Sequence, residues 1–266
     1  MNSVMDRVVA WVARLVFVFL YVPIVAVIVY SFNASQTTST WGGFSLQWYS
    51  ELLTDGALLQ TLRTSLVIGI SAAVLATVIG FLAALGLSRY RVRGQRFVLG
   101  AILLPLIVPE IVLGAALLSV YSFAEIKLSL LTIVLGHLVI TLPLATLIIL
   151  GALSSLDPTL PEAAADLGAN PWQTFSRVLF PLTRSALLAS FLLSFTTSFS
   201  NIVISTFTGG VGSTTLPLRV YSLLKTGITP EINALGALLI LLTVAIVAAV
   251  GLRQMRRILA GTTAGS

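Results

Sequence analysis

The chain has 266 residues, of which 57% are hydrophobic and 9% are charged, whereas about a quarter of the residues in a soluble domain carry a charge. This composition excludes a soluble globular fold, because so few charged side chains could not cover its surface. The net charge of +6 comes from basic residues in short segments between apolar runs, so it indicates membrane topology and not a nucleic-acid surface. The absence of cysteine excludes disulfides, thiolate metal sites and cysteine nucleophiles.

Six apolar segments are long enough to cross a bilayer as helices, which takes about 20 residues each. We expect them near residues 11–32, 62–88, 97–121, 129–152, 184–206 and 232–252. The first segment is longer than the apolar core of a signal peptide, so we expect a retained helix. The fold class is therefore an all-α membrane protein with six transmembrane helices in a single domain, residues 1–266.

The basic residues predict the orientation, because Lys and Arg favour cytoplasmic loops. An even number of spans puts both termini on one side. With cytoplasmic termini, the inside holds Arg7, Arg14, Arg89, Arg91, Arg93, Arg96, Arg177, Arg184, Arg253, Arg256 and Arg257, and the outside holds only Arg63, Lys127, Arg219 and Lys225. Loops 33–61 and 207–231 then face outward, either as simple connectors or as a docking surface for an external partner.

The third and fourth spans contain the ionisable residues that stand out. Glu110 is the sole acidic residue within a span, and charges at that depth are functional candidates by default. Pro105, Pro109 and Gly114 indicate a kinked or interrupted helix that could expose backbone to a cavity. Glu110 either attracts a cationic substrate or pairs structurally with Arg63 or a backbone amide. For His137, the only histidine, we favour a helix-packing hydrogen bond over a ligand role.

Hydroxyl and amide side chains are concentrated in the fifth span. Seven polar residues lie within twelve positions, namely Ser194, Thr196, Thr197, Ser198, Ser200, Asn201 and Ser205. Such side chains either hold helices together or line a polar pathway. We predict that Thr197, Ser200 and Asn201 contribute to the pathway with Glu110, because an amide can both donate to and accept from a substrate.

The loop at 153–183 is long but not simply polar. Pro161 suits the first turn of a helix, and Gly168 can end that helix with a positive φ. Asn170 followed by Pro171 predicts the start of a second short helix. Leu167, Trp172 and Phe175 supply apolar surface. The loop is therefore either a helix pair on the membrane surface or a rigid knob that docks into a cytoplasmic partner.

This loop resembles the signature of ATP-binding-cassette importer permeases. In that pattern Glu-Ala-Ala is followed by three residues and Gly, and then by nine residues, Ile, any residue and Leu-Pro. Here Glu162, Ala163 and Ala164 precede Gly168, and Val178 and Phe180-Pro181 complete the spacing with conservative departures. The resemblance implies a coupling loop and a type I importer permease fold. Together with the apolar side chains of the loop, it predicts that the residues coupled to the ATPase are Glu162, Ala163, Ala164, Leu167, Gly168, Ala169, Trp172, Phe175 and Pro181.

Further segments look like the spermidine/putrescine permeases of the second-subunit type. They are Tyr30-Ser31-Phe32-Asn33, Trp48-Tyr49, the turn from Ser88 to Gly94, the segment from Leu216 to Ser222 and that from Thr229 to Leu235. The resemblance implies an ATP-driven, binding-protein-dependent importer in the bacterial inner membrane. Its implied partners are a second, homologous permease, two ATPase subunits and an external solute-binding protein. No Gly-Lys-Ser/Thr phosphate loop occurs here, so ATP and Mg²⁺ would be used by the separate ATPase and no cofactor is expected on this chain.

The sequence departs from these permeases at Ser200-Asn201, where they have a pair of aspartates. The substrate is therefore either a polyamine or related small amine, or an amino-acid-like or opine-like solute. Two other classes compete. A secondary carrier would explain six spans but not the loop motif, and no inverted repeat is evident. An intramembrane serine protease would need more than His137 and serines without a glycine-framed motif.

Overall fold

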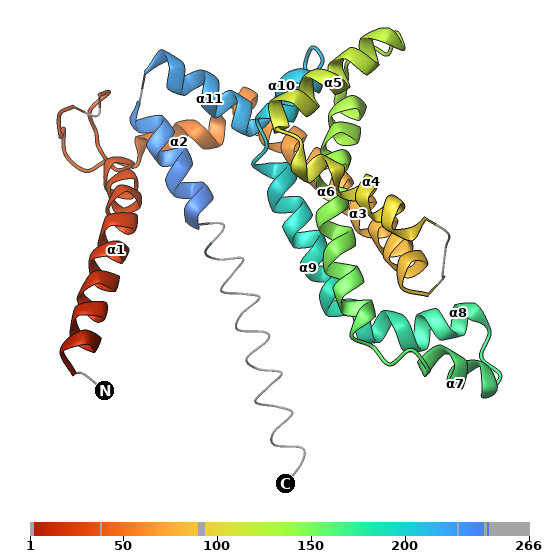
Figure 1. The fold of residues 1–266 in the computed structure, drawn as a ribbon. Coiled ribbons are helices and arrows are strands. Elements are labelled where there is room, and N and C mark those ends of the chain that lie inside the picture. Colours follow the sequence, from red (N-terminus) through yellow and green to blue (C-terminus); the bar gives the residue numbers. More distant parts are fainter. Residues whose placement is uncertain (1–2, 38, 90–93, 228, 242–243, 245–266) are drawn as a thin grey trace. The chain divides into compact units, whose positions relative to one another are not determined.

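The computed structural model describes residues 3–37, 39–89, 94–227, 229–241 and 244. These residues form helices joined by turns, with one isolated bridge between Asn33 and Phe44. Contacts divide the chain into two compact units (Figure 1). One consists of Met1–Gly56 with Val220–Ser266, and the other is Ala57–Arg219.

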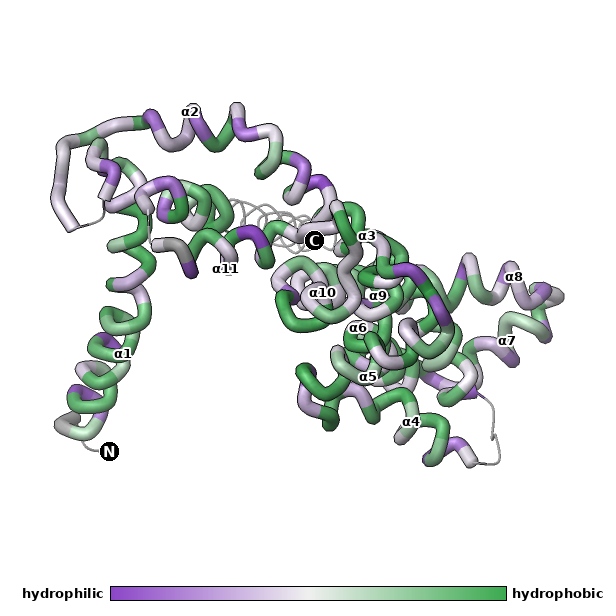
Figure 2. Tube along the Cα trace, turned by 90° about the horizontal axis from the view of Figure 1, so that it is seen from above, coloured by the Kyte–Doolittle hydropathy of each residue, from purple (hydrophilic) through white to green (hydrophobic). Residues whose placement is uncertain are grey.

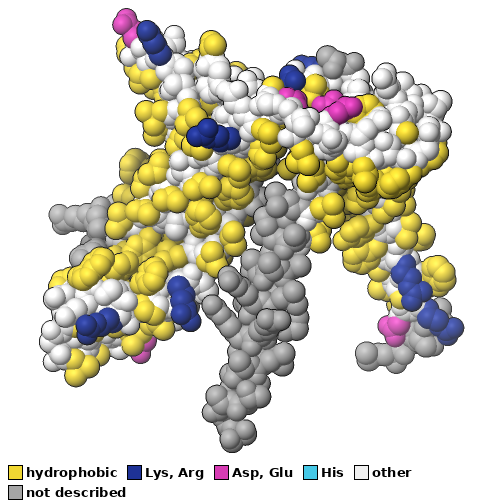
Figure 3. Space-filling view, turned by 180° about the vertical axis from the view of Figure 1, so that it is seen from behind, with side chains coloured by type: hydrophobic (Ala, Val, Ile, Leu, Met, Phe, Trp, Pro, Cys, Tyr) yellow, Lys and Arg dark blue, Asp and Glu magenta, His cyan; other side chains and the backbone are white. Residues whose placement is uncertain are grey.

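Helix α1 (Ser3–Tyr30) is the span of the first unit. Its side chains are exposed from residue 5 to residue 26, and they are predominantly hydrophobic, as the green tube in Figure 2 shows. The space-filling view likewise shows hydrophobic side chains over much of the visible helical surface (Figure 3). An apolar helix exposed on all sides is typical of a membrane span.

Asn33 organises the loop that follows α1. It is fully buried, its Oδ1 accepts hydrogen bonds from the N–H groups of Ser35 and Gly42, and its Nδ2 donates to the Thr40 carbonyl at 2.8 Å. The Trp48 indole donates to the Asn33 carbonyl at 2.7 Å. Trp48 lies in helix α2 (Gln47–Thr54), so two segments that the sequence marked separately meet in space.

Three further helices that are long and apolar enough to span a membrane lie almost entirely in the second unit. They are α3 (Gly56–Arg89), α6 (Leu130–Ser154) and a helix that runs without interruption over Pro171–Phe199. Helix α3 starts six residues before the predicted 62, because Ala57, Leu58, Leu59 and Gln60 are strong helix formers that extend the helix beyond the apolar run. Across the described residues four helices are long and apolar enough to span a membrane, or five if one bent pair counts as a span.

The third apolar segment, predicted at 97–121 with a kink or an interruption, contains two helices. It consists of α4 (Gln95–Ile107) and α5 (Glu110–Phe123), bent by 108°. Pro109 causes the interruption, because a proline disfavours helical backbone at the preceding residue. Val108 accordingly has an extended conformation, with ψ of 132°. The expectation of an interrupted helix here is confirmed.

The fifth and sixth spans also differ from their predicted bounds. The fifth ends at Phe199, and α10 (Val203–Thr208) follows as a separate helix. The outward loop predicted at 207–231 contains α11 (Leu216–Thr226). An apolar helix occupies Pro230–Leu241, and most of the rest of the predicted sixth span, at 242–243 and 245–252, lies outside the described residues.

Small residues let α10 pack closely against α5 and α6. A Cβ at Gly114 would lie 2.6 Å from a ring carbon of Phe207, and a Cβ at Gly136 would lie 2.7 Å from Cγ2 of Ile204. The Thr132 hydroxyl donates to the Thr208 carbonyl at 2.8 Å and adds a buried link from α6 to α10. These contacts hold the short helix α10 beside two longer ones.

We predict that Gly136→Ala destabilises the protein, whereas Gly151→Ala in the same helix does not. The first substitution overpacks against a stiff, β-branched side chain, at a cost of about 1–3 kcal/mol. Nothing lies within 4 Å of a Cβ at Gly151, where the alanine gains only helix propensity. Thermal unfolding of the two purified variants in detergent measures the difference, and equal midpoints would contradict the close packing of α10.

Candidate functional sites: the Glu-Ala-Ala loop and the Glu110–Asn201 junction

The loop 153–183, here called the Glu-Ala-Ala loop, begins with a turn that precedes a short helix. Thr159 donates to the Asp157 carboxylate through its N–H at 2.9 Å and its hydroxyl at 2.7 Å, and these bonds lower the pKa of that carboxyl. Helix α7 (Leu160–Asp166) follows, with Pro161 and Glu162 in its first turn. An acidic residue there is favourable beside the positive end of the helix dipole.

Gly168 ends α7 as the sequence predicted. Its φ is +83°, its N–H donates to the Ala165 carbonyl at 2.8 Å, and the Ala169 N–H donates to the Ala164 carbonyl at 3.0 Å. This pair of bonds is a Schellman motif, which requires a left-handed residue at the position of Gly168. The turn between the two loop helices is therefore fixed by hydrogen bonds.

The second loop helix begins where predicted but is not short. The Asn170 side chain accepts from the Gln173 N–H at 2.9 Å, and the Gln173 side chain accepts from the Asn170 N–H at 2.9 Å, a reciprocal capping box. From Pro171 the helix continues through α8 (Pro171–Thr174), a π-helical turn (Phe175–Leu179) and α9 (Phe180–Phe199). The wider π-helical turn ends two residues before Pro181, which lacks a backbone donor. The loop thus passes directly into the fifth span.

The marked side chains of the loop divide into an outer and an inner set. Leu167 is 89% exposed and Trp172 is 71% exposed, and Glu162 and Ala163 are also exposed. Phe175 points inward, with its ring 5.5 Å from that of Phe81 on α3. It packs on a buried cluster formed by Phe81, Ala84, Ile149 and Leu153. Phe175 therefore anchors the loop, while Leu167 and Trp172 give the outer set apolar side chains that the described residues leave exposed.

A groove separates the loop from the end of α3. It has a volume of about 560 Å³, and its lining includes Ser88, Arg89, Glu162, Ala165, Ala169 and Thr174. The Arg89 guanidinium donates to the Pro158 carbonyl at 3.2 Å. The loop is thus held at its base by an aromatic contact and by a hydrogen bond to the neighbouring span.

At the other end of α9, Asn201 separates two helices. Its Oδ1 accepts from the Ile204 N–H at 2.8 Å, which caps the start of α10, and its carbonyl accepts from the Ser205 hydroxyl at 3.1 Å. Amide side chains are favoured at such positions because they satisfy donors that the helix leaves free. Asn201 is 9% exposed, so its conformation is determined within the protein.

The Asn201 Nδ2 donates to the Glu110 carboxylate. Glu110 is the first residue of α5 and lies directly after the bend from α4. Two interrupted helices therefore meet at their interruptions, through one hydrogen bond between an amide and a carboxylate. This contact, here called the Glu110–Asn201 junction, joins two of the four predicted pathway residues. Among the described residues, Glu110 pairs with Asn201 and not with Arg63 or a backbone amide.

The other two predicted pathway residues lie near the junction but are not part of its hydrogen bonds. The Ser200 hydroxyl is exposed and donates to the Thr196 carbonyl at 2.9 Å, and Thr197 is half-buried. Glu110 is exposed. The junction can thus present one carboxylate, with neighbouring hydroxyls, to a solute.

His137 lies beside the junction, on α6. Its Nδ1 is 2.6 Å from the Ser198 hydroxyl and its Nε2 is 3.0 Å from the Ser205 hydroxyl. His137 is 1% exposed and Ser198 is 3% exposed. A histidine that activates a serine needs a group that orients its other nitrogen and a nucleophile open to substrate. Here the second nitrogen faces another hydroxyl and the site is closed, so the arrangement is that of a packing contact.

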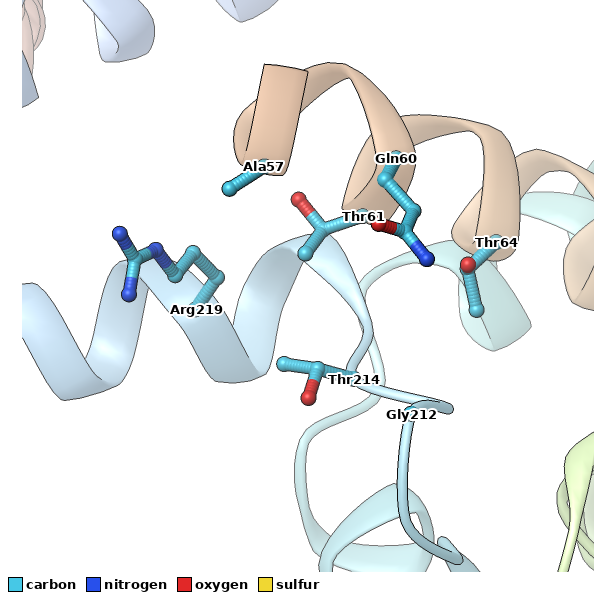
Figure 4. Close-up of a pocket in the computed structure, with 7 residues that line it drawn as sticks. All are labelled: Ala57, Gln60, Thr61, Thr64, Gly212, Thr214 and Arg219. Atoms are coloured by element: carbon cyan, nitrogen blue, oxygen red, sulfur yellow. The ribbon is translucent and has the colours of Figure 1, made fainter. Parts of the chain in front are cut away.

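A smaller polar hollow of about 230 Å³ lies elsewhere in the second unit (Figure 4). Three segments far apart in the sequence line it: the start of α3 with Gln60, Thr61 and Thr64, the turn with Gly212 and Thr214, and Arg219 on α11. The Arg219 Nε is buried and has no hydrogen-bond partner among the described residues. Sequence reasoning did not find this hollow, because no local pattern connects its three segments.

Known proteins similar to this chain belong to the class that the Glu-Ala-Ala loop predicts. Residues 76–260 match the family described as "Binding-protein-dependent transport system inner membrane component". The spermidine/putrescine transport system permease protein PotC of Haemophilus influenzae is 39% identical over 232 residues, which cover 87% of this chain and 90% of the relative. The putrescine transport system permease protein PotI of Escherichia coli is 38% identical over 231 residues, covering 84% and 82%.

A solved structure supports the fold. The chain superposes on a chain of a bacterial ABC transporter involved in the import of the acidic polysaccharide alginate, with a TM-score of 0.70 at 17% identity, over 96% of this chain and 98% of that one. The expected importer-permease fold is therefore confirmed. In these systems ATP hydrolysis occurs in a separate subunit. The chain belongs to the family of binding-protein-dependent transport system inner membrane components.

Proposed function

We propose that this chain is one of two homologous permease subunits in an inner-membrane importer for polyamines or related small amines. Two ATPase subunits would dock on the Glu-Ala-Ala loop and hydrolyse ATP with Mg²⁺. An external binding protein would deliver the solute to the permease. Both termini and the Glu-Ala-Ala loop would be cytoplasmic. The identity to PotC and PotI over most of the chain supports this class of substrate.

The observation that carries the mechanism is the uninterrupted helix Pro171–Phe199. It starts at the capped turn of the Glu-Ala-Ala loop and ends two residues before Asn201. Because a helix transmits displacement along its axis, movement of a docked ATPase would reach the junction and change the solute pathway. Alternation between outward-open and inward-open states then needs a ligand that binds one state more tightly than the other. ATP and the loaded binding protein would supply this difference in binding free energy.

The substrate proposal depends on charge at the junction. Glu110 offers a carboxylate to an ammonium group, which is the main polar feature of every polyamine. A specific observation favours a less highly charged solute: Ser200 and Asn201 replace the aspartates that the resemblance led us to expect, and Asn201 donates to Glu110. An amino-acid-like or opine-like solute with a single cationic group is the second candidate.

We predict that Glu162→Lys and Gly168→Asp abolish transport while membrane insertion stays normal. Glu162 and Gly168 lie on the exposed side of the loop, and a side chain at φ of +83° strains the backbone by about 1–2 kcal/mol. ATP hydrolysis stimulated by the loaded binding protein, and co-purification of the ATPase, should both fall. Ser155→Ala, in the same loop but outside the motif, is the control, and undiminished uptake by both variants would refute the coupling role.

We predict that a cysteine at Ser39→Cys reacts with an impermeant maleimide in sealed cells and that one at Ser155→Cys does not. The chain has no native cysteine, so each label reports one position. The excess of Arg and Lys on the proposed cytoplasmic side is the physical reason. Permeabilised cells, in which both positions should react, are the control. The reverse pattern would invert the proposed topology.

We predict that Glu110→Gln lowers uptake of a diamine roughly 10- to 100-fold at normal expression, because a charge-assisted hydrogen bond contributes about 1.5–3 kcal/mol. Asn201→Asp keeps the cap on α10 but places a second carboxylate beside Glu110. Together with Ser200→Asp it should shift preference toward a triamine, since adjacent carboxylates repel unless a cation lies between them. Uptake of a diamine, a triamine and a zwitterionic amino acid by the reconstituted transporter measures this. An unchanged rank order in both variants would place selectivity in the binding protein.

A further inference from the structure

The His137 ring is one step in a chain of hydrogen bonds that ends at Asn201. The ring contacts Ser198 near the end of α9 and Ser205 on α10. It therefore connects the two helices across the interruption at residues 200–202, in addition to the peptide backbone itself. Ser205 in turn donates to the Asn201 carbonyl at 3.1 Å.

The direction of these bonds follows from the number of protons available. A hydroxyl carries one proton and a carbonyl can only accept. Since the Ser205 proton is given to the Asn201 carbonyl, the His137 Nε2 must donate to Ser205. Both ring nitrogens face neutral hydroxyls, and an unpaired buried charge is costly, so the ring is neutral. Its Nδ1 then accepts from Ser198. The bonds run from Ser198 through His137 and Ser205 to Asn201.

We propose that His137, as the neutral Nε2–H tautomer, is a positioning residue that fixes the Asn201 interruption and thereby holds Glu110 in place. The side chain of Asn201 is then determined at both ends: its Oδ1 caps α10 at the Ile204 N–H and its Nδ2 donates to Glu110. His137 touches neither Glu110 nor the solute in this arrangement. The transport consequence rests on the proposed function, whereas the tautomer and the direction of the bonds do not.

The ring can be observed directly, because His137 is the only histidine of this chain. We would label histidine nitrogens with ¹⁵N in the reconstituted transporter and identify the His137 signal by its loss in His137→Gln. The expected spectrum shows a protonated Nε2 and an unprotonated Nδ1. A protonated Nδ1 or a doubly protonated ring in the unmodified protein would overturn the proposal.

Single hydroxyl deletions test the direction. Ser198→Ala should keep the Nε2–H tautomer, because Ser205 still requires a donor. Ser205→Ala should let the proton move to Nδ1, where Ser198 can accept it, and should lower amine uptake. Thr206→Ala is the matched control: its hydroxyl makes the same kind of bond within α10, to the Ile202 carbonyl at 2.8 Å, and is not part of the His137 chain. If Ser205→Ala behaves like Thr206→Ala in both spectrum and uptake, the proposal is wrong.

Substitutions of the ring itself separate hydrogen bonding from packing. His137→Leu fills a similar volume with no polar atom, and His137→Gln retains a donor and an acceptor. We expect His137→Leu to lower uptake roughly tenfold, which is the effect of losing one buried hydrogen bond. We expect His137→Gln to retain most of the uptake of the unmodified transporter. Equal uptake by the two variants would overturn the positioning role. If the unmodified transporter takes up no amine, the proposed substrate is wrong, and the ring spectra alone then decide between the two directions.

Discussion

The geometry of this permease depends on one continuous helix that joins the Glu-Ala-Ala loop to the fifth span. The sequence had predicted a short loop helix followed by a separate span. Pro171–Phe199 begins at a reciprocal capping box and passes through a π-helical turn before it crosses the apolar region. The Schellman turn at Gly168 fixes how the preceding helix α7 joins it. The contact between Phe175 and Phe81 holds the start of the long helix against α3. A loop joined to a span in this way cannot absorb displacement by bending at a flexible link, so a force on its exposed surface acts on the span.

The opposite end of the same helix leads to a site built from two interruptions. Pro109 ends α4, Asn201 separates α9 from α10, and the side chains of Glu110 and Asn201 meet there. Interrupted helices at membrane depth are tolerated where their free backbone groups are satisfied or face a cavity. Here the amide of Asn201 satisfies one such group, and the exposed Glu110 carboxylate faces outward from the contact. Structural and functional roles of Glu110 are thus not alternatives, because the hydrogen bond that holds it leaves part of its carboxylate open.

Much of the local structure was predictable from neighbouring residues. Proline and asparagine at helix starts, glycine at a helix end and proline within an apolar run each act within about four residues, and the structure has a cap, a left-handed turn and a bend at those positions. Span boundaries were less well predicted: α3 begins before the apolar run, and the fifth span begins at Pro171, not near residue 184. Hydropathy marks where lipid contacts a helix but not how far the helix extends beyond the bilayer.

The sequence by itself determined the class of the chain, the importer-permease loop and the four candidate pathway residues, because composition, spacing and residue type are local properties. Only the tertiary structure decided which of those residues meet. Glu110 and Asn201 are 91 residues apart, and His137 is 61 and 68 residues from its two serine partners. Such contacts arise from the close packing of α5, α6 and α10 at residues without a Cβ, such as Gly114 and Gly136, and no periodicity within a single helix encodes which neighbour will lie against it.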